Sequence, residues 1–65
     1  MFYEITLFDG EESIDVHVIK HANKVSVRMP GGGPLTSRAR NWLKRGFWRD
    51  DEAPEWVVEK LSSKR

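Results

Sequence analysis

The side chains best suited to chemistry lie in one basic, aromatic segment, residues 28–49. This segment carries six basic side chains, three aromatic rings and no acidic residue. Cations neutralise phosphates, guanidinium groups contact phosphate or guanine through paired hydrogen bonds, and flat rings stack on bases. The segment therefore predicts a nucleic-acid interface in which the cations contact phosphates and an exposed ring stacks or wedges. The predicted interface residues are Arg28, Arg38, Arg40, Lys44, Arg45, Trp48 and Arg49.

The acidic side chains that follow this segment support a competing interpretation. Five carboxylates lie within residues 50–59, and they could pair with the arginines of a solvated helix face. The formal net charge of +1 is the sum of −3 over residues 1–27, +6 over 28–49 and −2 over 50–65. The near-neutral total therefore leaves one question open, which is whether the last acidic segment folds back over the basic one.

Catalytic and metal-binding chemistry have less support. Ser13, Asp15 and His17 are the residue types of a catalytic triad, but on one face of one strand they cannot converge. On a strand, His17 and His21 would stand about 13 Å apart, too far to share a metal ion. The chain has no cysteine to complete such a site. We expect neither an enzyme, nor a metal site, nor a cofactor.

Length and composition restrict the architecture that can position these residues. Sixty-five residues allow one small domain, spanning 1–65, and the lack of cysteine excludes a disulfide. No apolar run is long enough to cross a membrane, and no signal-peptide pattern follows Met1. We expect a cytoplasmic protein without a membrane partner, held together by packing alone.

The first half of the chain, residues 1–29, predicts an antiparallel sheet. Apolar and polar residues alternate with a period of two, which is typical of half-buried strands. Asp9-Gly10 suits a tight hairpin, and Asn23 is the residue of the second turn expected to adopt a positive φ. Sequential strands joined by short turns form a meander. The strands are expected over residues 2–8, 14–20 and 25–29.

The second half predicts helices. A Gly/Pro linker over 30–35 precedes a basic amphipathic helix over 36–46, capped by Thr36 or Ser37 and ended by Gly46. This helix places Trp42 in the core. A short C-terminal helix is expected over 53–62. Its inward residues would be Pro54, Val57, Val58 and Leu61. The fold class is therefore α+β, a three-stranded meander followed by one or two short C-terminal helices packed on one face.

The uncovered face of this sheet suggests a second function. Phe2, Phe8 and Ile19 are more apolar than a solvated face requires. Together with His17 they predict an alternative interface for a larger protein or a second copy of the chain. In that case the protein is an inhibitor or adaptor. Alternatively, the C-terminal tail partly covers the first strand.

The element order resembles that of the AP2-type and integrase arm-type DNA-binding domains and of the chromodomain. The first two types read DNA with their exposed sheet face. Here that face is mixed, because Glu4 and Asp15 oppose Arg28. The resemblance therefore implies the fold alone. In its size and lack of a catalytic set, the chain is also similar to small regulators of phages and mobile elements. We predict a small non-enzymatic regulator that binds DNA or RNA, with a protein-interaction module as the alternative.

Overall fold

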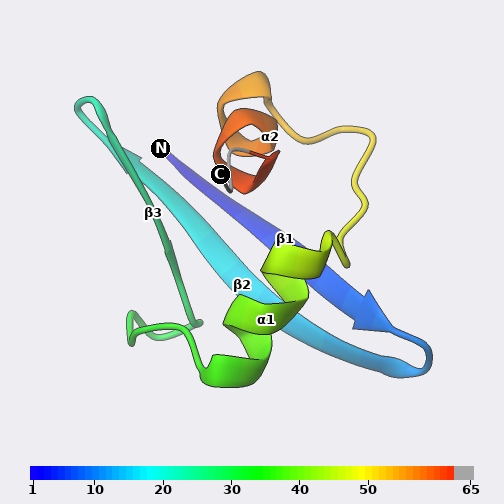
Figure 1. The fold of residues 1–65 in the computed structure, drawn as a ribbon. Coiled ribbons are helices and arrows are strands. Elements are labelled where there is room, and N and C mark those ends of the chain that lie inside the picture. The colour runs from blue at the N-terminus through cyan, green and yellow to red at the C-terminus, as the bar shows by residue number, and fades with distance from the viewer. Residues whose placement is uncertain (63–65) are drawn as a thin grey trace.

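The computed structural model describes residues 1–62 and contains one three-stranded antiparallel sheet followed by two helices. The strands are β1 (Phe2–Asp9), β2 (Glu12–His21) and β3 (Lys24–Arg28), in the spatial order β1-β2-β3. The helices are α1 (Ser37–Arg45) and α2 (Glu55–Ser62), and both lie on the same face of the sheet (Figure 1). The predicted α+β fold is confirmed. No helix of residues 1–62 is long and apolar enough to cross a membrane.

Both hairpins use two-residue turns. The β1–β2 register ends at Asp9 opposite Glu12, so Gly10 is the first turn residue, and its φ of 66° is one that glycine adopts readily. In the β2–β3 turn the positive φ of 57° belongs to Ala22, not to Asn23 as predicted. The register pairs His21 with Lys24 and so makes Ala22 the first turn residue. Turn position therefore outweighs the residue preference of asparagine.

The core lies between the sheet and the two helices. Alternate residues of β1 and β2 face the helices, and Trp42 of α1 is only 6% exposed, which confirms its predicted place in the core. Burial of one large ring and several branched side chains is the main favourable term for so short a chain. The buried residues are Ile5, Leu7, Val16, Val18, Ala39, Trp42, Val57 and Leu61.

Local signals fix the ends of α1. The Thr36 hydroxyl accepts a hydrogen bond from the backbone N–H of Ala39 at 3.2 Å, as an N-cap does. Gly46 ends the helix in the left-handed conformation, with a φ of 77°. The caps fix the ends of α1, and burial of Ala39 and Trp42 fixes which side of the helix faces the sheet, and hence the directions in which its cationic side chains project.

The inward stripe of α2 differs from the prediction. Val57 and Leu61 are buried as expected, but Val58 is 37% exposed. Trp56, which the sequence pattern did not single out, packs against the core instead. Val57 occupies the centre of the stripe, so only one of its two neighbours can also face the sheet. The larger apolar area of the tryptophan ring favours Trp56.

Candidate nucleic-acid interface

The cations of α1 lie along two flanks of the helix. Arg40 and Lys44 are four residues apart, so they project on the same side, and both line a hollow together with residues of α2. Both side chains are exposed. Arg38 and Arg45 lie outside this hollow. The helix therefore divides the predicted interface into one flank nearer α2, formed by Arg40 and Lys44, and a second flank.

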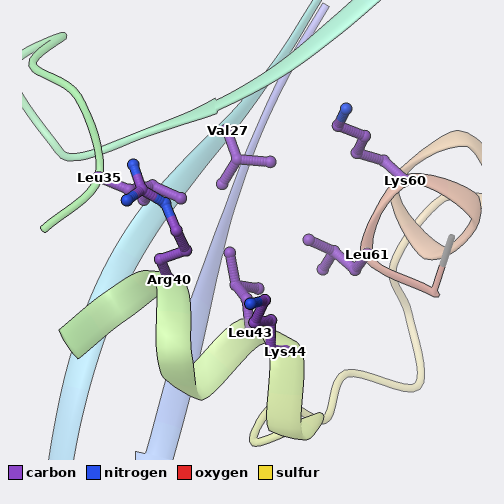
Figure 2. A pocket seen from close by; sticks show the side chains of 7 residues that line it. All are labelled: Val27, Leu35, Arg40, Leu43, Lys44, Lys60 and Leu61. Carbon is purple, nitrogen blue, oxygen red and sulfur yellow. The ribbon is translucent and has the colours of Figure 1, made fainter. Parts of the chain in front are cut away.

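The hollow between α1 and α2 has an apolar floor and a cationic rim. Its volume is about 290 Å³. In Figure 2, Val27 of β3, Leu43 of α1 and Leu61 of α2 converge on it from three elements. Leu35 completes the apolar surface. Arg40 and Lys44 stand on the α1 side, and Lys60 stands on the α2 side. We call this hollow the α1–α2 groove.

Two further hollows adjoin this groove and share residues with it. One, of about 190 Å³, is lined by Arg40 and Lys44 together with the hydrogen-bonding side chains of Ser37 and Asn41. The other has a volume of about 460 Å³ and shares Lys60 with the groove. Its lining residues are Lys20, Asn23, Val25, Trp56, Glu59 and Lys60. The three hollows therefore form a connected surface from α1 across α2 to the β2–β3 hairpin. Its charged residues are the cations Arg40, Lys44, Lys60 and Lys20 and the acidic Glu59.

The sequence analysis missed the α2 and hairpin residues of this surface. Lys60 immediately precedes the buried Leu61, and Lys20 Nζ lies 6.0 Å from the ring centroid of Trp56. A helical wheel could have placed Lys60 at the edge of the apolar stripe of α2. Only the packing of α2 beside α1 brings Lys60 to Arg40 and Lys44.

The second flank of α1 is engaged in local contacts. The guanidinium of Arg38 lies 3.8 Å from a carboxylate oxygen of Glu12, and the guanidinium of Arg45 lies 6.0 Å from the ring centroid of Phe47. Both groups of the Arg38–Glu12 pair are largely exposed, so this pair adds little stability. Its effect is to neutralise one of the seven predicted interface residues.

The remaining predicted residues are dispersed. Arg28 alternates with the groove residue Val27, so it lies on the opposite face of the sheet, where it donates to the Gly32 carbonyl at 3.4 Å. Arg49 is exposed in the connector between the helices. Neither residue lines the three hollows described above.

Trp48 is half-buried rather than exposed. The connector runs along the edge of β1, where the backbone N–H of Phe8 donates to the Phe47 carbonyl at 2.8 Å and Trp48 forms a bridge with Leu7. The edge of β1 offers unpaired backbone groups, and the connector satisfies some of them. The Trp48 ring consequently packs against the core and is a poorer stacking platform than the sequence suggested.

The last acidic segment does not pair with the cations of α1. Within residues 1–62, Arg40, Lys44, Arg45 and Arg49 form no ion pair with a carboxylate of residues 50–59. Asp50 instead accepts hydrogen bonds from the Tyr3 hydroxyl and from the Glu52 N–H. The bond to Asp50 raises the pKa of Tyr3 to about 12, and the bond from Tyr3 lowers the pKa of Asp50.

The open face of the sheet is mixed in character. Phe2 is 59% and Phe8 50% exposed, while Ile19 is half-buried. The His17 ring meets Phe2 edge-on, with 4.7 Å between centroids, and its Nε2 lies 3.4 Å from a Glu4 carboxylate oxygen. Both helices cover the other face (Figure 1), and the predicted cover by the C-terminal tail concerns residues 63–65, outside the described range.

The described residues form no candidate metal-binding site. Among residues 1–62, no group of three or more histidine, aspartate or glutamate side chains is placed to hold a metal ion.

Comparisons with protein-family models, with curated proteins and with solved structures find no match to this chain.

Proposed function

We propose that this protein is a small non-enzymatic regulator that binds nucleic acid through the α1 flank nearer α2. One observation carries the proposal. Arg40 and Lys44 are exposed side by side, and neither has an acidic partner among the described residues. Unpaired neighbouring cations attract phosphates, because each contact releases condensed counterions.

The neighbouring polar residues support the same proposal. Ser37 and Asn41 lie beside the two cations and supply uncharged hydrogen-bonding groups. Such side chains commonly contact phosphate and sugar oxygens and fix the register of a bound strand. A regulator of this size would act by occupying its nucleic acid. A cytoplasmic location, expected from the sequence, would give it access to DNA and RNA.

A matched pair of double variants tests the proposal. Arg40→Gln with Lys44→Gln and Arg38→Gln with Arg45→Gln remove the same charge from opposite flanks of α1. Affinity for a labelled oligonucleotide is measured by fluorescence anisotropy over a series of salt concentrations. We expect the first variant to reduce the slope of log affinity against log salt by about 1.4–1.8, because each lost phosphate contact removes about 0.7–0.9.

The second variant should change this slope much less, because Arg38 already faces Glu12 and Arg45 lies over Phe47. If the two double variants reduce this slope equally, the nucleic acid is attracted by diffuse electrostatics and has no defined site on α1. Absence of a complex at low salt would refute the proposed function.

The open sheet face supports a second candidate function, which is binding to a larger protein. Its specific observation is that two phenylalanine rings, Phe2 and Phe8, are at least half exposed. The test is a pull-down from cell extract before and after nuclease treatment. A partner that survives nuclease and is lost in Phe8→Glu, but kept in the Arg40/Lys44 variant, would favour this candidate over nucleic-acid binding.

A further inference from the structure

Resting on the proposed function, we infer that the ligand is a single-stranded polynucleotide, one of whose bases enters the α1–α2 groove. The inference comes from the combination of two surfaces in one hollow. The rim carries the cations Arg40, Lys44 and Lys60, whereas the floor is formed by aliphatic side chains. A ligand that uses both surfaces must be anionic and must also present an apolar, flat group.

A duplex would contact the cationic rim of this groove but not its apolar floor. Its bases are stacked and paired inside the helix, so the duplex presents phosphates and polar groove edges to a protein. The apolar floor would then lose its water without gaining an apolar contact. A single strand instead has unstacked bases that can leave the backbone and be buried, as single-stranded regions do in sequence-specific RNA recognition.

The groove has room for such a base. Its volume of about 290 Å³ is close to the lower end of the range for small-molecule pockets, ~300–1,000 Å³. Val27, Leu43 and Leu61 approach it from three different elements (Figure 2), so a flat group would be in contact on more than one side. The cations on the rim would remain close to the phosphates that flank the base.

The adjoining hollows extend the path for a strand in two directions. On the α1 side, Ser37 and Asn41 continue the polar lining. On the α2 side, the hollow that shares Lys60 is lined by Lys20, by the half-buried ring of Trp56 and by one carboxylate, that of Glu59. Cations along a path with an aromatic ring beside it are typical of proteins that bind single strands, and an OB-fold of this class covers ~4–16 nucleotides. Arg40 and Lys44 would therefore hold the middle of a short strand.

The experiment compares four ligands of the same length, about ten nucleotides: single-stranded DNA, single-stranded RNA, the DNA duplex, and a DNA strand that lacks bases at its central positions. Binding to the full chain is measured by fluorescence anisotropy at one low salt concentration. We expect the intact strands to bind about tenfold more tightly than the abasic strand and the duplex, as loss of one base buried against aliphatic side chains predicts. The ratio of the DNA and RNA affinities identifies which strand the groove prefers.

A floor variant provides a second readout that leaves the charges intact. Leu35→Ser removes apolar surface from the groove, and Val58→Ser removes an exposed valine of α2 that lies outside the three hollows. We expect Leu35→Ser alone to weaken binding of the intact single strand several-fold while leaving the abasic strand unaffected. Thermal melting of both variants confirms that they are folded.

The outcomes separate this inference from the proposed function. Equal affinity for the intact strand, the abasic strand and the duplex would overturn the inference but leave nucleic-acid binding standing. Binding of none of the four ligands would overturn both.

Discussion

Single residues decide which of the predicted cations remain available. Arg38 and Arg40 are two positions apart and chemically identical, yet one faces Glu12 and the other lines the α1–α2 groove. Similarly, Trp42 and Trp48 belong to the same segment, but neither ring is free, because one is in the core and the other packs at the edge of β1. Residue type therefore predicts the chemistry, and local geometry decides which residue performs it.

The hydrogen bond between Tyr3 and Asp50 ties the start of the acidic segment to β1. It links the first strand to the connector, 47 positions along the chain. Neutral Tyr3 is the form that donates, so the raised pKa makes this contribution to stability complete below pH 10.0 and lost as the pH rises through about 12. The lowered pKa of Asp50 means that the contribution is also lost in acid, as the pH falls below 3.8.

Titration of the tyrosine measures this contact directly. Tyr3 is the only tyrosine of the chain, so the tyrosinate absorbance reports this residue alone. We expect a midpoint near pH 12 in the native protein and a midpoint close to 10.0 in Asp50→Ala, which removes the acceptor and its charge. A native midpoint at the ordinary value would show that the connector is not held at β1 by this bond.

At the scale of elements, α2 has two roles, closing the core and providing one wall of the groove. Val57 and Leu61 are buried under the helix, while Lys60 lies on the rim of the hollow. Packing of α2 therefore fixes the position of the cation opposite Arg40 and Lys44. Loss of its buried contacts would disturb stability and binding together.

Two neighbouring valines of α2 provide a matched test of this packing. Val57 is 0% exposed and Val58 is 37% exposed. We expect Val57→Ala to lower the free energy of unfolding by about 2 kcal/mol, from lost apolar transfer and the cavity left behind. Val58→Ala should change it by no more than about 0.5 kcal/mol. Urea denaturation measures both, and equal effects would contradict the observed rotation of α2.

Most of the fold could be predicted from the sequence because its signals are local. Alternation in the strands, Thr36 and Gly46 at the ends of α1, and the Gly/Pro linker each act within a few residues. Where two local patterns competed, prediction failed. In α2, the expected spacing favoured Val58 over Trp56, but the larger apolar area of Trp56 favours its burial against the sheet.

The candidate site could be predicted only in part. Arg40 and Lys44 follow from the basic segment, but their separation from Arg38 and Arg45 does not. That separation depends on Glu12 of the β1–β2 hairpin beside Arg38 and on Phe47 beside Arg45. Lys60 and Trp56 join the surface through contacts between elements far apart along the chain. Such contacts leave no periodic signal in a single sequence.

At the scale of the whole molecule, the total charge of only +1 conceals a local concentration of cations on α1, which carries four basic side chains and no acidic one. The acidic connector is held against the β1 edge, and α1 and α2 lie together on one face of the sheet (Figure 1), where α2 adds Lys60 but also Glu55 and Glu59. The open face, which combines the exposed rings of Phe2 and Phe8 with charged residues, lies on the other side. The molecule thus presents two distinct candidate surfaces on opposite faces, and a ligand that occupies one has no direct contact with the other.

Mapping the bound surface by NMR tests the central claim most directly. Backbone amide signals are followed while a single-stranded oligonucleotide is added to the full chain at low salt. The account predicts shifts along the groove, at Arg40, Lys44 and Lys60, with Phe2 and Phe8 of the open face unchanged. Shifts confined to the open face, or no shifts at all, would contradict it.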